Sequence, residues 1–147
     1  MPVSIRDAAP ADITAILTIE QSTPPAAHWS AEQYQSRIKD GGVMVAQREG
    51  RICGFLCVRV VAGEWEIENV VVDEEFRRHG IGAALMRALL NKWEAASGAS
   101  VLLEVRESNA AARAVYEASG FSQVGRRRAY YGDLVEDAIL YARYRRT

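Results

Sequence analysis

Hydrophobic residues recur along the chain with two different periods, which separate the expected strands from the expected helices. Apolar residues at alternate positions are typical of strands, and apolar residues spaced by one helical turn are typical of helices that bury one face. We expect strands at 3–6, 43–48, 51–60, 64–72, 101–105, 121–131 and 138–144, and helices at 10–23, 31–40, 81–97 and 109–119.

Capping and turn residues support these boundaries. Ser30 followed by Gln33 is the capping-box pattern of a helix start, and Gly120 can supply the left-handed residue that ends a helix. Glu49-Gly50 and Ala62-Gly63 lie between alternating segments and favour hairpin turns. These local signals agree with the hydrophobic pattern.

The element order and the length fit one mixed α/β domain. The order is β-α-α-β-β-β-α-β-α-β-β, and 147 residues is the length of a single ordinary domain. Apolar residues make up 49% of the chain and charged residues 25%, the balance of a globular protein. We therefore expect a single domain over residues 1–147.

Charge and hydropathy exclude several classes of partner. The net charge of −1 gives no overall field that would attract nucleic acid. No apolar run approaches the roughly 18 residues that span a membrane, and Arg6 and Asp7 lie where a signal peptide would be apolar. We expect a cytoplasmic monomer or weak dimer with no nucleic-acid or membrane partner.

The two cysteines give no sign of a disulfide or a metal site. Cys53 and Cys57 lie on one expected strand, so their Cα atoms would be about 13 Å apart, which is beyond disulfide reach. His28 and His79 complete no zinc-binding spacing. We expect both cysteines to be buried apolar residues, and no metal site.

The junction between the strand at 64–72 and the helix at 81–97 has the features of an anion-binding loop. A helix start presents unpaired backbone N–H groups at the positive end of the helix dipole, and glycines let an anion approach them. The alternative is a tight turn with solvated arginines. The candidate residues are Arg77, Arg78, His79, Gly80, Ile81, Gly82 and Ala83.

Two segments resemble the GCN5-related N-acetyltransferase (GNAT) family. The loop at 77–83 is similar to the one that binds the acetyl-CoA pyrophosphate in that family. Residues 103–121 carry the order of the family's last acetyl-CoA-binding segment, with Leu-Glu-Val-Arg at 103–106 and Ser-Asn-Ala-Ala-Ala at 108–112. The family's element order, a GNAT-like acyl-CoA N-acyltransferase fold, matches essentially the whole chain.

Within that family, the closer resemblance is to bacterial ribosomal-protein-alanine N-acetyltransferases of the RimI type. It is carried by the two motifs just named and by residues 28–30, 126–131 and 135–138, the last of which begins at Val135. The resemblance implies transfer of acetyl from acetyl-CoA to the N-terminal alanine of a small-subunit ribosomal protein. It implies acetyl-CoA as co-substrate and no metal.

The resemblance also implies how acetyl-CoA is held. Its pyrophosphate would bind the backbone of the loop at 77–83, and its pantetheine arm would pair with backbone N–H groups of Val70, Val71 and Val72. Asn109 would bond the CoA arm. Asn109 is also a good helix N-cap, and both roles can hold together.

Acetyl transfer to an amine needs a proton acceptor and a proton donor. Glu104 lies between apolar Leu103 and Val105, which favours a shielded carboxylate, and the resemblance makes it the general base. Tyr116 lies on the apolar face of its helix, and the resemblance places its hydroxyl beside the CoA sulfur as the general acid. The alternatives are a solvated strand glutamate and a core tyrosine.

Acidic and basic clusters add further candidate site residues. Glu64, Glu66 and Glu68 share one strand face, where they could attract a cationic acceptor. Glu66 or Glu68 is the alternative base, and a solvated acidic face is the competing interpretation. We interpret the arginines at 126–128 mainly as solvated surface.

Two other functions remain open at this point. The same fold could acetylate a small-molecule amine, or it could hold acyl-CoA as a sensor without turnover. Retention of both Glu104 and Tyr116 disfavours the sensor.

Overall fold

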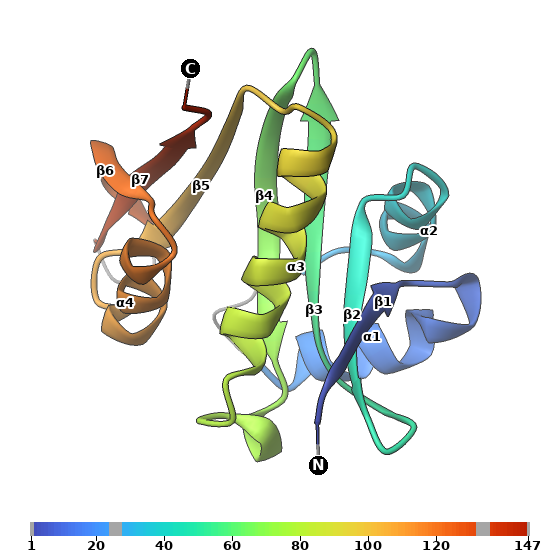
Figure 1. The fold of residues 1–147 in the computed structure, drawn as a ribbon. Coiled ribbons are helices and arrows are strands. Elements are labelled where there is room, and N and C mark those ends of the chain that lie inside the picture. Colours follow the sequence, from blue (N-terminus) through green and yellow to red (C-terminus); the bar gives the residue numbers. More distant parts are fainter. Residues whose placement is uncertain (1, 24–27, 132–135, 147) are drawn as a thin grey trace. The chain divides into compact units, whose positions relative to one another are not determined.

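The computed structural model describes residues 2–23, 28–131 and 136–146, and within them the expected strands and helices are found in the expected order (Figure 1). Val135, part of one motif of resemblance, lies outside the described residues. The strands are β1 (Ser4–Asp7), β2 (Val43–Arg48), β3 (Arg51–Val61), β4 (Glu64–Val72), β5 (Ser100–Arg106), β6 (Ser122–Tyr131) and β7 (Glu136–Tyr144). The helices are α1 (Ile13–Gln21), α2 (Ala31–Lys39), α3 (Ile81–Ala95) and α4 (Ala110–Ala118), with 3₁₀ helices at Pro10–Asp12 and Glu74–Phe76.

The local signals act as expected. Ser30 Oγ accepts a hydrogen bond from the Gln33 N–H at 3.2 Å, and Gln33 Oε1 accepts one from the Ser30 N–H at 2.8 Å, which completes the capping box. At the two hairpins, Glu49-Gly50 has φ of 53° and 77°, and Ala62-Gly63 has φ of 51° and 83°. Positive φ at both central residues is the type I′ turn, which matches the twist of the flanking strands.

The first helix departs from the expectation, because residues 10–12 form a 3₁₀ turn before α1 begins. The Asp12 carboxylate accepts a hydrogen bond from the Ala9 N–H at 2.7 Å and pairs with both terminal nitrogens of Arg6, at 2.8 and 3.0 Å. Its hydrogen bonds to the Arg6 guanidinium hold the pKa of Asp12 below its usual value. This ion pair ties the turn to β1.

The strands form a mixed sheet in the order β1-β2-β3-β4-β5-β7-β6. The pairs β1–β2, β2–β3, β5–β7 and β6–β7 are antiparallel. Strands β4 and β5 are parallel, with Glu64 opposite Ser100 and Glu66 opposite Leu102. Parallel neighbours need a long crossover, and α3 lies in the segment that makes it. The predicted mixed α/β class is confirmed.

The chain divides into two compact units. Unit 1 comprises Met1–Arg59 and Glu68–Leu90, and unit 2 comprises Val60–Ile67 and Asn91–Thr147. The boundary runs through β3, β4 and α3, so each of these elements contributes to both units. The expectation of a single domain stays a prediction.

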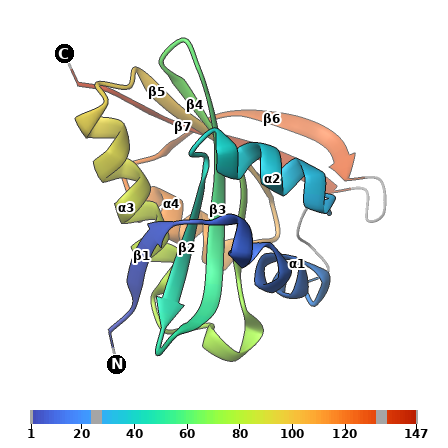
Figure 2. The ribbon, with the colours of Figure 1, turned by 90° about the vertical axis from the view of Figure 1, so that its right-hand side faces the viewer.

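In unit 1, helices cover both faces of the strands. Figure 2 shows α1 and α2 on one side of β2 and β3, and α3 on the other. On the α3 side, a side chain at Gly54 would meet Ile81 Cγ2 at 3.1 Å and the Val71 carbonyl oxygen at 2.9 Å, so glycine allows the close approach of α3. The core on the α1–α2 side consists of Ile13, Ile16, Ile19, Tyr34, Val43, Val45, Phe55, Cys57 and Val71.

In unit 2, α4 packs on the sheet through Tyr116. The Tyr116 ring lies 6.1 Å from the ring of Phe121 and 6.2 Å from that of Tyr141 between centroids. Tyr141 donates to Glu117 at 2.6 Å and accepts a hydrogen bond from Arg113 at 3.0 Å. These contacts fix α4 against β7.

The packing at Gly54 predicts a stability difference between two glycine substitutions. Gly54→Ala forces Val71 or α3 to shift, so it should lower the free energy of unfolding by about 1–3 kcal/mol, the usual result of overpacking. Gly82→Ala is the control, because its Cβ would meet only Val72 Cγ2 at 3.9 Å. Urea denaturation measures both. Equal midpoints for Gly54→Ala and the wild type would contradict this packing argument.

Candidate functional site

The start of α3, in unit 1, carries backbone donors that the helix itself does not use. The first N–H to find an acceptor within the helix is that of Ala84, which donates to the Gly80 carbonyl at 3.0 Å. The N–H groups of Ile81, Gly82 and Ala83 have no acceptor within the helix, and such a start favours an anion. Gly80 enters the helix with a φ of 73°, which suits glycine.

The segment before α3 is held by Arg51, a residue that the sequence analysis did not identify. Its guanidinium pairs with Asp73 at 3.4 Å and Glu75 at 3.0 Å, and it lies 5.0 Å above the Phe76 ring. The Asp73 N–H donates to the Cys53 carbonyl at 2.9 Å. This anchoring fixes where the loop begins, while Arg77, Arg78, His79 and Gly80 are exposed.

Gly82 is not required by the packing of the protein. Unlike Gly54, it has open space beside its Cα, because a Cβ at this position would meet only Val72 Cγ2, at 3.9 Å. Glycine in a helix costs about 0.5–1 kcal/mol relative to alanine. A small residue that internal packing does not demand is consistent with close approach by an external group.

Strand β4 leads into this loop with alternating side chains. Val71 is 2% exposed and belongs to the core on the α1–α2 side, whereas Val70 and Val72 are half-buried. The packing of Val71 in the core fixes the backbone of residues 70–72. The N–H groups of these three residues are the predicted partners of the pantetheine arm.

Glu104, in unit 2, is not shielded as the sequence analysis expected. Its side chain is 31% exposed, and its Oε1 accepts from Arg127 Nη2 at 2.7 Å. The apolar neighbours Leu103 and Val105 are buried, but side chains alternate across a strand, so they face away from the carboxylate. Glu104 therefore has the surroundings of a solvated strand glutamate, which was the alternative interpretation. Its role as general base stays a prediction.

Tyr116 has a buried ring and a hydroxyl with no recorded partner. The residue is 9% exposed, and burial raises the pKa of its hydroxyl to about 12. Among the described residues, no hydrogen bond is recorded for this hydroxyl, in contrast to that of Tyr141. Tyr116 therefore stays protonated at neutral pH with its proton available.

Asn109 is the N-cap of α4. Its Oδ1 accepts from the Ala112 N–H at 3.2 Å, which leaves the amide nitrogen to donate elsewhere. The Ser108 N–H donates to Glu136 at 2.6 Å, and this hydrogen bond lowers the pKa of Glu136. The capping role expected for Asn109 is confirmed.

The acidic face of β4 is partly neutralised. Both oxygens of Glu68 accept from Arg37, at 2.6 Å from Nε and 3.0 Å from Nη2. Glu64 is exposed and Glu66 is half-buried. Because Glu68 is engaged through both oxygens, it is poorly placed to accept a proton from an amine, and the choice between Glu104 and Glu66 as base stays a prediction.

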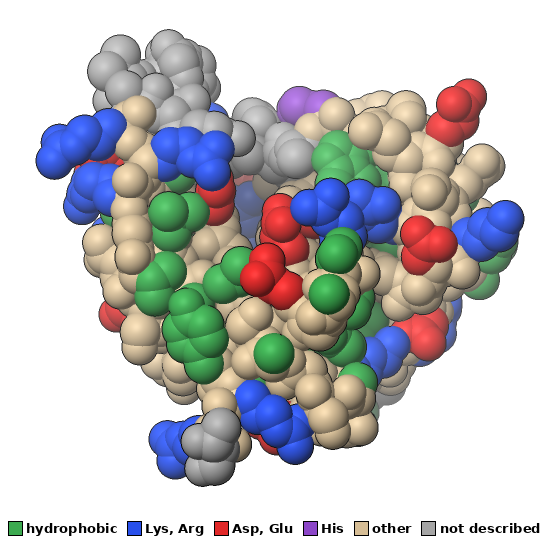
Figure 3. All heavy atoms as spheres, turned by 90° about the horizontal axis from the view of Figure 1, so that it is seen from above, with side chains coloured by type: hydrophobic (Ala, Val, Ile, Leu, Met, Phe, Trp, Pro, Cys, Tyr) green, Lys and Arg blue, Asp and Glu red, His purple; other side chains and the backbone are tan. Residues whose placement is uncertain are grey.

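The arginines at 126–128 are exposed, as expected. Arg126 pairs with Glu107 and with Asp137, both at 2.7 Å, and these two carboxylates raise the pKa of Arg126. Acidic and basic side chains are also interspersed over the face drawn in Figure 3.

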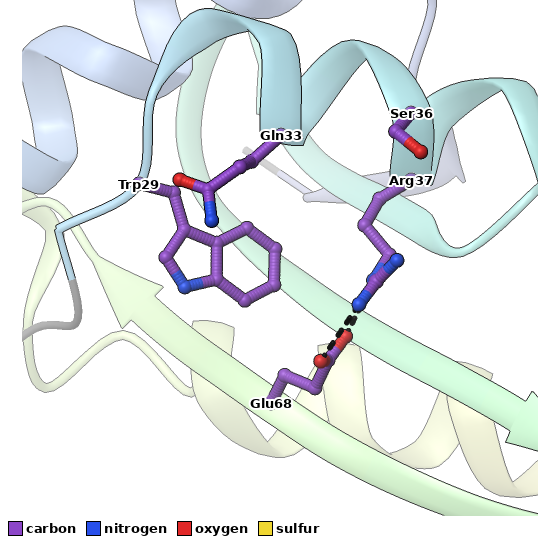
Figure 4. Close-up of a pocket in the computed structure, with 5 residues that line it drawn as sticks. All are labelled: Trp29, Gln33, Ser36, Arg37 and Glu68. Carbon is purple, nitrogen blue, oxygen red and sulfur yellow. Dashed lines mark hydrogen bonds and ion pairs between the residues drawn. The ribbon is translucent and has the colours of Figure 1, made fainter.

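A pocket of about 380 Å³ opens beside α2 in unit 1 (Figure 4). Figure 4 shows the Trp29 ring on one side of it and the Arg37–Glu68 ion pair on the other. The sequence analysis identified Glu68 but not Arg37, because the two residues are 31 positions apart and no local pattern links them. The lining residues are Trp29, Gln33, Ser36, Arg37 and Glu68.

The described residues hold no group of three or more metal-ligating side chains and no helix long and apolar enough to cross a membrane. Cys53 and Cys57 are buried free thiols, as expected. Burial raises the pKa of both thiols, so they are unreactive at neutral pH.

Comparison with known proteins places these features in context. Residues 12–121 match the Acetyltransferase (GNAT) family. The ribosomal protein bS18-alanine N-acetyltransferase of Escherichia coli is 41% identical over 97 residues, which span 65% of this chain and 66% of that protein, just under two thirds of its length. The crystal structure of the E. coli ribosomal-protein-S18-alanine N-acetyltransferase superposes with a TM-score of 0.85 and 34% identity, covering 96% of this chain and 92% of that one. Ard1 from Thermoplasma volcanium has a TM-score of 0.89 and 29% identity, with 100% of both chains covered.

Proposed function

Because the chain belongs to the GNAT acetyltransferase family, as its motifs indicated, we propose that it transfers an acetyl group from acetyl-CoA to the α-amine of a protein N-terminus. The acceptor that we propose is the N-terminal alanine of a small-subunit ribosomal protein. The observation that carries this proposal is the 41% identity to the E. coli ribosomal-protein-alanine enzyme.

The start of α3 is the proposed site of the acetyl-CoA pyrophosphate. Its free N–H groups and its exposed arginines suit a doubly charged anion, and Gly82 leaves room for it. The N–H groups of Val70–Val72 would pair with the pantetheine arm, and one of them would polarise the thioester carbonyl. The free amide nitrogen of Asn109 would donate to the CoA arm.

Two side chains of unit 2 are proposed to move the protons. As the acceptor nitrogen bonds to the acetyl carbon, Glu104 takes the proton that the nitrogen releases. As the carbon–sulfur bond breaks, Tyr116 donates its hydroxyl proton to the departing thiolate. A hydroxyl with a pKa of about 12 is fully protonated beforehand, as a donor must be.

The exposed setting of Glu104 supports an α-amine as acceptor. An N-terminal α-amine has an ordinary pKa of about 7.7–8.0, whereas that of a lysine side chain is about 10.4. A solvated carboxylate suffices to accept a proton from the first, because an α-amine releases its proton far more readily than a lysine side chain does. A lysine would need a stronger base.

The proposed placement of the pyrophosphate at the start of α3 predicts that a bulky residue there weakens acetyl-CoA binding. Gly82→Trp puts a bulky side chain over the free N–H groups, so calorimetry should show acetyl-CoA binding weakened by tenfold or more. Arg87→Trp is the matched control, because Arg87 is exposed on the same helix beyond its first turn. Equal affinities for Gly82→Trp and the wild type would place the pyrophosphate elsewhere.

The role of Tyr116 predicts a defect in turnover without a defect in binding. Tyr116→Phe removes only a hydroxyl, so acetyl-CoA affinity should be kept while kcat falls about 10²–10⁴-fold, the range for a lost general acid. Tyr144→Phe is the control, since Tyr144 is 63% exposed. Unchanged single-turnover rates in Tyr116→Phe would assign Tyr116 to packing alone.

The acceptor class is tested by release of CoA with matched substrates. A peptide that begins with alanine should be acetylated faster than the same peptide with a blocked N-terminus and one internal lysine. A polyamine and a free amino acid serve as small-molecule acceptors. Preferential acetylation of the lysine or of a small amine would overturn the acceptor assignment, and no turnover with any amine would favour a sensor.

A further inference from the structure

The side chain of Tyr116, in unit 2, is oriented by the packing of its ring. The residue is 9% exposed, and its ring lies between those of Phe121 and Tyr141, with interplanar angles of 56° and 61°. Among the described residues, no hydrogen bond is recorded that would hold its hydroxyl. The place of this hydroxyl therefore depends on the two rings that flank it.

The two flanking rings are tied to Tyr116 in different ways. The Phe121 N–H donates to the Tyr116 carbonyl at 3.1 Å, so that ring is attached through the backbone just after α4. Tyr141 comes from β7, and its place beside Tyr116 depends on contacts of its side chain. A change in those contacts would move one of the two rings and leave the other in place.

The hydroxyl of Tyr141 binds two charged residues of α4. It donates to Glu117 Oε2 at 2.6 Å and accepts a hydrogen bond from Arg113 Nε at 3.0 Å. Arg113 Nη1 in turn donates to the Glu107 carbonyl at 3.0 Å, which holds the guanidinium from its other side. Tyr141 is 1% exposed, so water has little access to these hydrogen bonds. One buried hydroxyl thus joins β7 to α4.

Both partners of this hydroxyl lie on the helix face that carries Tyr116. Residues three and four positions apart are neighbours on an α-helix, so Arg113, Tyr116 and Glu117 share one side of α4. Tyr141 contacts that side twice, since its ring meets the Tyr116 ring and its hydroxyl meets the two charged side chains. These hydrogen bonds therefore set how the Tyr141 ring lies against that of Tyr116.

From these contacts we propose that Tyr141 is a positioning residue for acetyl transfer, which fixes the wall beside the Tyr116 ring and so places the Tyr116 hydroxyl for proton donation. The Tyr141 hydroxyl does this by holding its own ring to α4, and it takes no part in the proton transfer. The proposal rests on the proposed function, since it needs Tyr116 as the acid. A misplacement of about 1 Å can slow an enzyme about 100-fold, so a hydroxyl away from the reacting atoms can affect turnover.

The test uses Tyr141→Phe, which keeps the ring and removes the hydroxyl. Single-turnover acetylation of a peptide that begins with alanine should slow about tenfold, while the acetyl-CoA affinity measured by calorimetry stays that of the wild type. In Tyr116→Phe there is no hydroxyl left to place, so adding Tyr141→Phe should slow the reaction no further. A residue that acts only through the stability of the fold would slow both backgrounds by the same factor.

Two variants of Glu117 test the hydrogen bond from the other side. Glu117→Gln keeps an oxygen that can accept from Tyr141, whereas Glu117→Leu removes it. Glu117→Gln should therefore keep most of the single-turnover rate, and Glu117→Leu should be as slow as Tyr141→Phe. A Glu117→Leu enzyme with the wild-type rate would contradict the proposal.

Arg143→Met is the matched control, because Arg143 also joins β7 to α4. Its Nη1 donates to the Ser119 carbonyl at 3.0 Å, and its guanidinium lies 5.4 Å from the centre of the Trp93 ring. Loss of this contact should leave the single-turnover rate unchanged. An equal loss of rate in Arg143→Met and Tyr141→Phe would make the docking of α4 in general the cause and overturn the positioning role.

The outcome also separates this proposal from the proposed function. If Tyr116→Phe is slow and Tyr141→Phe is as fast as the wild type, the positioning role fails and the acid stands. If Tyr116→Phe is as fast as the wild type, the proposed acid fails and the positioning role fails with it.

Discussion

The close approach of α3 to β3 is the constraint on which the proposed cofactor site depends. Ile81, the first residue of the helix, is 2% exposed and packs where Gly54 has no side chain. That contact fixes where the helix begins, and therefore where the N–H groups without an acceptor inside the helix lie. Arg51 secures the preceding turn through Asp73 and Glu75. A packing requirement inside unit 1 thus determines the location of the proposed anion-binding surface.

Arginines pair with two of the carboxylates that are candidates for the base. Glu68 is held by Arg37 and Glu104 by Arg127. Partly exposed ion pairs contribute little to stability, about 0–1 kcal/mol each. Their consequence here is positional: one pair lines the pocket beside α2, and the other orients the proposed base. The expected acidic face of β4 carries less negative charge than the sequence alone indicated, because Arg37 neutralises Glu68.

The features that sequence could predict are those encoded by neighbouring residues. The capping box of Ser30 and Gln33 and the turn at Glu49-Gly50 depend on contacts within three positions, so their patterns are visible in the chain. Motif resemblance then supplied the family and candidate roles for Glu104 and Tyr116.

The missed features join distant positions. The pair of Arg37 with Glu68 spans 31 positions and that of Arg127 with Glu104 spans 23. Nothing in the local sequence of either partner distinguishes it from a solvated charge. The exposure of Glu104 differs from the expectation for another reason: a strand turns adjacent side chains to opposite faces, so the apolar neighbours Leu103 and Val105 do not surround the carboxylate.

The pocket beside α2 is shaped in part by Glu20, a residue that contacts the lining residue Trp29 but does not line the pocket itself. Glu20 lies on α1 and is sealed from solvent, yet it accepts a hydrogen bond from the backbone N–H of Trp29, whose side chain lines the pocket beside α2. A substitution in the interior of α1 that shifts this carboxylate would change the shape offered to a ligand without altering any lining residue. Two related sequences with identical lining residues can therefore differ in the ligand that this pocket accepts.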